Sequence, residues 1–317
     1  MAVTMTVAMM TADLTTISEP RSGPAPIDPR SRSQHGAEAG ASGTLWLIAV
    51  PIGNLEDITL RAVRILKSVS VIACEDTRST RQLLGLLDIT APKLIACHEH
   101  NERARAAEVI KLLESGEDVA LVSDAGTPSV SDPGYPVVTR VIEAGYAVSP
   151  LPGPCAAIAA LSASGLPTHR FRFVGFLSAK SSSRRAQLLE LREAQETLIF
   201  YESPHRLERF LSDAAEQIDA ERRAVIAREV TKRYEEFRRG TLGALAAAPG
   251  VIRGEVVVLI EGQSAEERAA NLDIDALIDA VLSEGLSPSA SAKAVSKRSH
   301  LTRQQAYDLL QKRRSST

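Results

Sequence analysis

Short apolar runs alternate with amphipathic helical segments over residues 44–164, and this alternation constrains the fold more than any other feature. The runs at 45–50, 69–73 and 119–122 each end in a turn rich in Gly, Pro or acidic residues. Continuous apolar strands separated by helices are typical of parallel sheets covered on both faces. The sequence therefore predicts an α/β fold with a mostly parallel sheet in this part of the chain.

Weaker patterns complete that sheet. Further strands are predicted at 93–96 and 147–151, and the predicted helices lie at about 79–87, 102–114, 135–143 and 155–164. Asn54 is placed to cap a helix whose apolar face carries Ile58, Ala62, Ile65 and Leu66. Asn101 is placed to cap the helix that begins at residue 102.

The pattern changes after Gly165, which divides the chain into regions. Strands at 171–175, 197–201, 224–227 and 256–260, with a charged helix at 181–194, predict a second α/β lobe. From residue 274 onward only helices are predicted, at 274–283, 289–298 and 302–313. The expected organisation is a disordered, Pro/Ser/Gly/Ala-rich extension at 1–42, an N-terminal lobe at 43–165, a second lobe at 166–262, and a linker with a basic helical module at 263–317.

Charge is balanced overall but not locally. The chain has 37 Lys and Arg against 39 Asp and Glu, which argues against a uniformly basic nucleic-acid binder. At the C-terminus, Asp308 is the only acid between Ser287 and Thr317, and Thr302 can cap the last helix. The basic residues there are Lys293, Lys297, Arg298, Arg303, Lys312, Arg313 and Arg314. This segment is either a surface for a phosphate backbone or a solvated tail.

The sequence patterns of metal sites, disulfide frameworks, common nucleotide-binding loops and membrane helices are absent from this chain. Cys74, Cys97 and Cys155 form no CxxC pair, and His98 and His100 lack a third ligand at metal-binding spacing, so neither a metal site nor a disulfide framework is predicted. There is no GxGxxG and no P-loop. No apolar run approaches the roughly 20 residues of a membrane helix. We expect a cytoplasmic protein that does not enter membranes.

Loops with residues typical of ligand-binding sites follow the ends of the predicted parallel strands. Four such loops, at 51–54, 75–78, 123–134 and 152–154, contain Gly, Pro or paired acids. Open parallel sheets bind ligands outside the carboxyl ends of their strands. Glycine admits a ligand close to the backbone, and proline stiffens the loop. A fifth loop, 97–102, is either a solvated turn or a substrate contact.

In this order, the loops resemble the tetrapyrrole-methylase superfamily of S-adenosylmethionine-dependent enzymes. Within it, they look like the ribosomal RNA small-subunit methyltransferase I family. The matching segments are VPIGNLEDITLRA (50–62), ACEDTR (73–78), LVSDAGTPSVSDPGYP (121–136), LPGPCAAIAALSASGLP (151–167), GFLSAK (175–180), YESPHR (201–206), AREVTKRYEE (227–236) and RGEVVVLIEG (253–262). The resemblance covers about residues 44–317. One departure is Ser178, where the family has proline, which puts the stiffness of that loop in question.

The resemblance implies a two-lobed fold with the cofactor between the lobes, commonly in a homodimer. It implies 2′-O-methylation of a cytidine ribose in the decoding region of 16S ribosomal RNA, within the assembled 30S subunit. S-adenosylmethionine would donate the methyl group and leave as S-adenosylhomocysteine. The implied cofactor contacts are Pro51, Gly53, Asn54, Asp124, Gly126, Thr127, Val130, Ser131, Cys155, Ala156 and Tyr201.

A ribose hydroxyl is a poor nucleophile until its proton is removed or strongly hydrogen-bonded. Glu75 and Asp76, paired carboxylates at a strand end, are the predicted catalytic groups, with Arg78 positioning a phosphate. Asp124 and Lys180 are further candidates. Glu75 can equally bind the cofactor ribose, because it lies about 20 residues past the first turn. The predicted substrate-binding residues are Lys180, Arg206, Lys293, Lys297 and Arg298.

Two other functions remain open at this point. A methyltransferase for a small tetrapyrrole would have no use for the basic C-terminal helices. A ribosome-assembly factor would bind RNA without affinity for S-adenosylmethionine.

Overall fold

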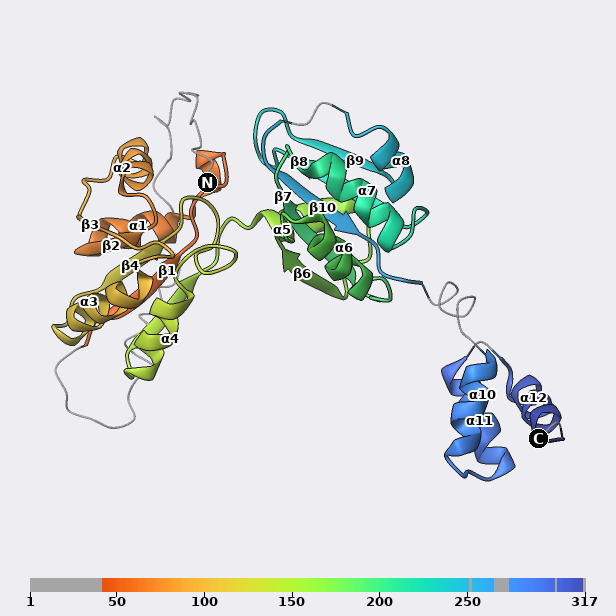
Figure 1. Cartoon of the computed structure of the whole chain (residues 1–317). Coiled ribbons are helices and arrows are strands. Elements are labelled where there is room, and N and C mark those ends of the chain that lie inside the picture. Colours follow the sequence, from red (N-terminus) through yellow and green to blue (C-terminus); the bar gives the residue numbers. More distant parts are fainter. Residues whose placement is uncertain (1–41, 251–252, 265–273, 300, 316–317) are drawn as a thin grey trace, which may run out of the picture. The chain divides into compact units, whose positions relative to one another are not determined.

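A computed structural model describes residues 42–250, 253–264, 274–299 and 301–315 (Figure 1). The predicted extension at 1–42 and the linker at 263–272 therefore lie almost wholly outside the described residues. The chain divides into two compact units, with the division between Ala156 and Ala157. Each unit is described by itself.

The first unit contains a five-stranded sheet in the order β3-β2-β4-β1-β5. Its strands are β1 (Thr44–Ile48), β2 (Val71–Cys74), β3 (Lys93–Ala96), β4 (Val119–Val122) and β5 (Ala147–Leu151). Every pairing is parallel, and β4 lies between β1 and β2, with Val119 opposite both Leu45 and Val71. The predicted parallel sheet is confirmed.

Helices cover both faces of this sheet. They are α1 (Leu60–Ser68), α2 (Thr77–Leu86), α3 (Glu102–Glu114) and α4 (Tyr135–Glu143). The next helix, α5 (Ala156–Ser164), begins at the division and belongs almost wholly to the second unit. Ile65 of α1 and Leu84 of α2 pack in one apolar cluster, and Val109 of α3 and Val141 of α4 pack in the other. Alternate strand residues point into opposite clusters, as a period of two requires. Burial on both faces explains why the central strands β1, β2 and β4 are almost continuously apolar.

Two predicted caps differ from the structure. Asn54 caps a short 3-10 turn, η2 (Leu55–Asp57), and α1 begins later, with Thr59 as its cap. Asn101 stands at the N-cap of α3 without capping it. Its Oδ1 accepts a hydrogen bond from His98 N (2.9 Å) and its Nδ2 donates to Ala96 O (3.1 Å). The cap prediction for Asn101 was wrong because the amide satisfies the preceding loop instead.

The second unit contains a mixed sheet in the order β6-β7-β10-β8-β9. Its strands are β6 (Phe171–Gly175), β7 (Thr197–Glu202), β8 (Arg223–Arg228), β9 (Glu236–Thr241) and β10 (Val256–Ile260), and only the β6–β7 pairing is parallel. The helices α6 (Ser181–Glu190), α7 (Leu207–Gln217) and α8 (Leu242–Ala247) accompany it. The charged helix predicted to reach residue 194 ends at Glu190. The edge strand β9 was not predicted.

Three helices end the chain: α10 (Ile274–Ser283), α11 (Pro288–Arg298) and α12 (Arg303–Ser315), close to their predicted bounds. They share a small core that includes Ile278, Val295 and Leu310. Thr302 caps α12, since its Oγ1 accepts from Gln305 N at 3.2 Å. Among the helices of the described residues, none is long and apolar enough to cross a membrane.

Candidate functional site

The strand-end loops of the first unit are joined by short hydrogen bonds. Val50 N donates to Gly126 O (2.9 Å), and Gly126 N donates back to Val50 O (3.0 Å). Thr127 Oγ1 donates to Pro154 O (3.2 Å). These bonds bring the predicted loops at 51–54, 123–134 and 152–154 into one assembly at the carboxyl edge of the sheet.

At two glycines in this assembly a side chain would be strained, at one by a close contact and at the other by the backbone conformation. A Cβ at Gly153 would lie 2.8 Å from the Ala49 Cβ, closer than real Cβ atoms come. Gly126 has a φ of +73°, which L side chains rarely adopt. Close packing at Gly153 and backbone conformation at Gly126 therefore both require glycine in these loops.

The segment from Ser129 to Gly134 holds an uncommon backbone. Ser129 (φ 69°) and Ser131 (φ 62°) are non-glycine residues in the left-handed region. The Ser129 Oγ is buried and finds no hydrogen-bond partner among the described residues. Gly134 N donates to Glu102 Oε2 (2.9 Å), which fixes the end of the segment to α3. Strained conformations of this kind gather at ligand-binding sites.

Four carboxylates lie near one another at this edge. Glu75 and Asp76 follow β2, and Asp124 follows the neighbouring strand β4, where its Oδ1 accepts from Asp76 N (3.2 Å). Burial raises the pKa of Glu75, and the charges of Asp124 and Asp76 raise it further. Burial also raises the pKa of Asp124. Asp132 is affected most: burial, then Glu75 and Asp124, raise its pKa to about 7.

Asp76 differs from the other three. Its Oδ1 accepts from Arg78 N (2.8 Å) and its Oδ2 from Arg78 Nη2 (2.7 Å). The hydrogen bonds from Arg78 lower the pKa of Asp76 to about 2. Asp76 is thus ionised and fully engaged at neutral pH, which makes it a poor proton acceptor. Of the two predicted carboxylates, Glu75 is the one whose environment favours proton transfer.

Sequence reasoning placed Asp132 in a ligand loop without assigning it a role. The only signal was its position in SDPG, after two serines. Its proximity to Glu75 and Asp124 depends on the left-handed turns at Ser129 and Ser131, which the sequence does not reveal.

We expect Asp132→Asn to change how stability depends on pH. The folded chain binds the Asp132 proton more tightly than the unfolded chain, so this stabilisation is complete below about pH 4 and is lost as the pH rises to about 7. The free energy of unfolding of D132N relative to the natural protein should therefore rise by about 1–2 kcal/mol from pH 5 to pH 8, after discounting for partial exposure. Urea unfolding followed by fluorescence of the single tryptophan, Trp46, measures this. Parallel curves for the two proteins would contradict it, and Asp308→Asn is the matched control.

The residues predicted to contact the cofactor lie in both units. Ten lie on the three joined loops or at the start of α5, and Tyr201 lies on β7 of the second unit. The Tyr201 hydroxyl accepts from Ala157 N (3.3 Å). Its ring lies 5.0 Å from Phe173 and 5.6 Å from Phe176, edge to face in both pairs.

Two predicted substrate-binding residues lie close together in the second unit. Arg206 Nη2 donates to Leu177 O (2.8 Å) and Ser178 O (3.2 Å), and its Nε lies 3.3 Å from the Oε1 of buried Glu202. Lys180 is exposed and immediately precedes α6. Arg206 therefore supports the 177–180 loop, while Lys180 is presented to solvent.

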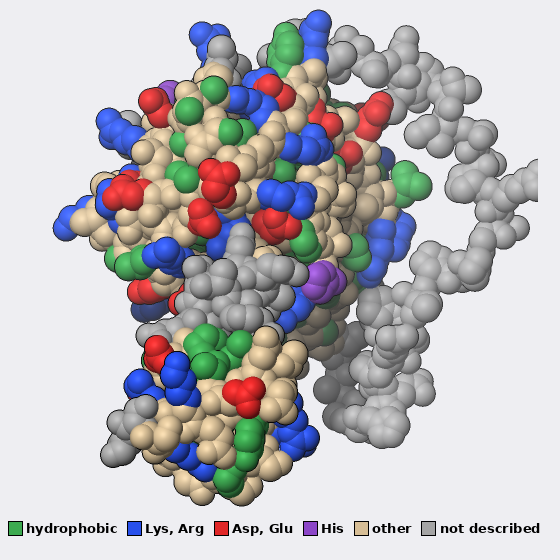
Figure 2. Space-filling model, turned by 90° about the vertical axis from the view of Figure 1, so that its right-hand side faces the viewer, with side chains coloured by type: hydrophobic (Ala, Val, Ile, Leu, Met, Phe, Trp, Pro, Cys, Tyr) green, Lys and Arg blue, Asp and Glu red, His purple; other side chains and the backbone are tan. Residues whose placement is uncertain are grey.

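The C-terminal helices are less basic in space than along the sequence. Arg298 pairs with Glu284 (2.6 Å), and Arg313 pairs with Asp279 of α10 (2.5 Å). Lys293 and Lys297 are exposed on α11 and form no ion pair with any residue that the structure describes. On the face of the molecule seen in Figure 2, Lys and Arg side chains are interspersed with Asp and Glu. The positive charge on α11 that no ion pair among the described residues neutralises is therefore confined to Lys293 and Lys297.

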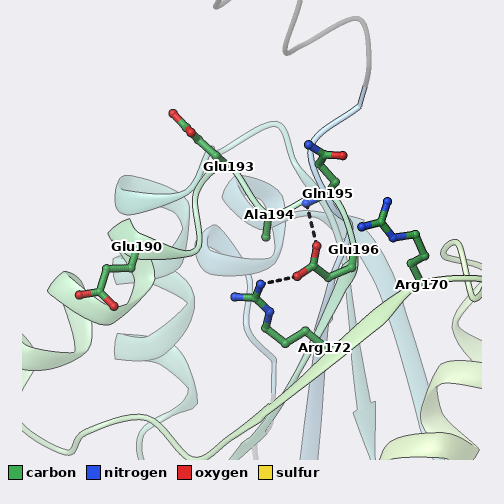
Figure 3. Close-up of a pocket in the computed structure, with 7 residues that line it drawn as sticks. All are labelled: Arg170, Arg172, Glu190, Glu193, Ala194, Gln195 and Glu196. Atoms are coloured by element: carbon green, nitrogen blue, oxygen red, sulfur yellow. Dashed lines mark hydrogen bonds and ion pairs between the residues drawn. The ribbon is translucent and has the colours of Figure 1, made fainter. Parts of the chain in front are cut away.

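An open pocket of about 310 Å³ lies elsewhere, at the start of β6 and β7 (Figure 3). Its charged lining is partly self-neutralised: Arg172 pairs with Glu196 (2.6 Å), and Glu196 also accepts from Gln195 N (3.2 Å). It lies at the opposite end of β7 from Tyr201 and Glu202. Within the described ranges, no group of three or more His, Cys, Asp or Glu is arranged to hold a metal ion.

Comparison with known proteins agrees with this architecture. The family model of the tetrapyrrole (corrin/porphyrin) methylases matches residues 44–246. Two similar proteins, from Pseudomonas aeruginosa (48% identity, 77% of this chain and 88% of the relative) and Escherichia coli O157:H7 (44%, 84% and 94%), are named ribosomal RNA small subunit methyltransferase I.

Solved structures agree on the fold. The native form of uroporphyrin III C-methyltransferase from Thermus thermophilus superposes with a TM-score of 0.51 at 18% identity, over 69% of this chain and 97% of that one. The methyltransferase CobJ gives 0.52 at 22% identity, over 70% and 95%. At this level of identity the likeness concerns the fold alone.

Proposed function

The chain belongs to the tetrapyrrole (corrin/porphyrin) methylase family, and from this premise we propose that it transfers a methyl group from S-adenosylmethionine to a cytidine 2′-hydroxyl in the decoding region of 16S ribosomal RNA. The observation that carries the proposal is the 44–48% identity, over about four fifths of the chain, to enzymes named for small-subunit ribosomal RNA. The enzyme class, a methyltransferase, follows from the same relatives and the family model.

The joined loops of the first unit fit the cofactor. Gly53 and Gly153 are exposed and carry no side chain, so a ligand can approach their backbone closely, whereas the backbone groups of Gly126 are bonded to Val50. Asp124 is placed to accept hydrogen bonds from a ribose or an amino group. The bound cofactor would supply a methyl group on a sulfonium. In the second unit, Tyr201 offers an aromatic ring beside the first turn of α5.

Methyl transfer to a ribose also requires activation of the acceptor hydroxyl, and the carboxylate cluster fits this role. Glu75, with its raised pKa, is the group we assign to accept the proton of the ribose hydroxyl, with Asp132 close enough to influence it electrostatically. Arg78 uses Nε and Nη2 on Asp76, which leaves Nη1 for an RNA phosphate. Holding donor and acceptor in line would supply much of the acceleration.

The preference for RNA over a small tetrapyrrole rests on the C-terminal helices. Lys293 and Lys297 are exposed and take no part in the apolar core of the three helices, so their charge is not explained by packing. We propose that they contact phosphates of the small subunit, that the enzyme acts as a homodimer on the assembled 30S subunit, and that it does so in the cytoplasm.

The proposal is tested by tritiated-methyl transfer to three acceptors: undermethylated 30S subunits, free 16S RNA and uroporphyrinogen III. We expect label in RNA alone, at one cytidine 2′-oxygen when the modified nucleotide is mapped. Label in the tetrapyrrole would overturn the substrate assignment. Calorimetry with S-adenosylmethionine provides the second arm: RNA binding without cofactor binding would favour an assembly factor.

Reversing the charge of two lysines should weaken RNA binding specifically. Lys293→Glu/Lys297→Glu is expected to raise KM for the RNA substrate about tenfold or more at low salt and to flatten its salt dependence, because each phosphate contact releases counterions. The control is Lys67→Glu/Lys111→Glu, which changes net charge equally on exposed helices of the first unit. Equal losses in both proteins would show a general charge effect instead.

A further inference from the structure

A solvent-exposed aromatic ring stands at the carboxyl end of β6. Phe176 is 57% exposed, although the chain has only six phenylalanines and 4% aromatic residues overall. Its ring lies 5.6 Å from that of Tyr201 at an interplanar angle of 63°, and Tyr201 in turn packs on Phe173. Phe176 is therefore oriented on one side by packing while more than half of it remains open to solvent.

The loop that follows Phe176 is anchored by hydrogen bonds from a neighbouring arginine. Arg206 Nη2 donates to the carbonyls of Leu177 and Ser178, and Arg206 is held in turn by Glu202. The Glu202 side chain is fully buried, and its Oε1 also accepts from Ser203 N (2.7 Å). Arg206, partly buried and paired with a fully buried carboxylate, thus supports two backbone carbonyls of a surface loop.

Ser178 completes the support in place of the proline expected there. Its N–H donates to Gln187 Oε1 (3.0 Å), a bond that proline cannot make, and its Oγ accepts from Lys180 N (3.2 Å). The loop is therefore fixed by hydrogen bonds rather than by a ring. Its two exposed side chains of note are Phe176 and Lys180, an aromatic ring and a cation four residues apart.

An exposed ring and a cation four residues further along the same hydrogen-bonded loop match the chemistry of single-stranded RNA. Unstacked bases bind by stacking on aromatic side chains, with phosphates met by Lys or Arg. Rigidity lowers the entropy lost when the base is captured. Burial of the Phe176 ring would stabilise the free protein, whereas its exposure leaves the ring surface available for contact with a binding partner.

We propose that Phe176 is a stacking platform for a base of the RNA substrate, on a loop that Arg206 and Glu202 position and from which Lys180 meets an adjacent phosphate. This inference rests on the proposed function, because it assigns a contact to the same RNA. It makes Arg206 a positioning residue rather than a substrate ligand, and Phe176 a binding residue that the sequence patterns did not single out.

The test compares Phe176→Ala, Phe176→Leu and Phe176→Trp with the natural protein. Phe176→Ala and Phe176→Leu are expected to raise KM for undermethylated 30S subunits roughly five- to a hundredfold, the range of base–aromatic stacking, and Phe176→Trp should stay within threefold. The Kd for S-adenosylmethionine, measured by calorimetry, should not change in any variant. Phe171→Ala is the matched control, because Phe171 begins the same strand and is 45% exposed.

Each result decides for or against the proposal. An unchanged KM for F176A, full activity of F176L, or an equal loss in F171A would overturn it. A changed elution volume for F176A would show that the ring covers a second copy of the chain, which also overturns it. If the natural protein itself does not methylate RNA, the proposed function fails instead, and the calorimetric Kd shows whether the cofactor site remains intact.

The role of Arg206 is tested separately from folding. Arg206→Lys keeps a charge beside Glu202 but not the forked donors that reach both carbonyls. We expect KM for the RNA to rise at least fivefold while kcat at saturating RNA stays within threefold and the unfolding midpoint is close to that of the natural protein. A loss in kcat with KM unchanged would contradict a positioning role.

Discussion

Glu75→Gln is expected to lower kcat for RNA methylation about 10²- to 10⁴-fold, the range for removal of a general base. Glutamine keeps the shape of the side chain but cannot accept the hydroxyl proton. Glu75 is favoured over its neighbour because Arg78 keeps Asp76 ionised, whereas burial raises the pKa of Glu75. Single-turnover methyl transfer at saturating cofactor and RNA measures the effect directly.

The pH profile of the same reaction gives a second readout. A base must be deprotonated, so the rate should fall as the pH is lowered through the pKa of Glu75, which burial and the charges of Asp124 and Asp76 place above its usual value. This acid limb should be absent from E75Q. Glu56→Gln, at an exposed position in η2, is the control and should behave as the natural protein does.

The alternative role of Glu75, binding the cofactor ribose, predicts a different pattern. In that case E75Q would raise the Kd for S-adenosylmethionine about tenfold or more, while the single-turnover rate at saturation stayed near that of the natural protein. Such a result would move the activation of the hydroxyl to another group, with Asp132 the next to test.

Arg184→Met should destabilise the second unit by about 3–5 kcal/mol, the cost of leaving one charge of a buried ion pair without its partner. The Arg184 side chain is 3% exposed and that of Asp213 is 11% exposed, and Arg184 Nε donates to Asp213 Oδ2 at 2.8 Å. The pair joins α6 to α7. Urea unfolding followed by circular dichroism measures the loss.

Two further variants make this expectation specific. The double variant Arg184→Met/Asp213→Leu removes both charges and should recover most of the lost stability. Arg185→Met changes the next residue of α6, whose side chain is 40% exposed and pairs with exposed Glu216 and, at a longer 3.8 Å, with Asp213; this variant should cost at most about 1 kcal/mol. If R184M and R185M were equally stable, burial could not explain the contribution of the Arg184–Asp213 pair to the free energy of unfolding.

The central strands of the first unit, β1, β2 and β4, could be predicted because each one is an almost continuous apolar run, buried on both faces. Residues 93–96 and 147–151 were placed at their observed bounds from pattern and spacing. β9 could not be predicted, since its sequence, EFRRGT, has the charges of an edge strand that lies against one neighbour only. β3 and β5 are edge strands too, but they retain several apolar residues, whereas β9 contains only Phe237.

The candidate site was predictable in position and less so in chemistry. Its loops follow from the rule that ligands meet the carboxyl ends of parallel strands. The different protonation of Glu75, Asp76 and Asp132 depends on which carboxylate receives Arg78 and which is buried, and this is decided in three dimensions. The net charge of the C-terminal helices could not be predicted either. Asp279 and Glu284 lie outside the basic stretch, yet they pair with Arg313 and Arg298.

The reciprocal hydrogen bonds between Val50 and Gly126 have a consequence for how such enzymes diverge. An insertion in either loop would displace the other, so the two must keep their lengths together. Changes of substrate within this fold are then easier to accommodate in the loops of the second sheet, such as the one that carries Phe176. A chimera that exchanges residues 175–180 with those of a relative, leaving 50–54 and 123–134 intact, should therefore retain the first unit while altering the choice of acceptor.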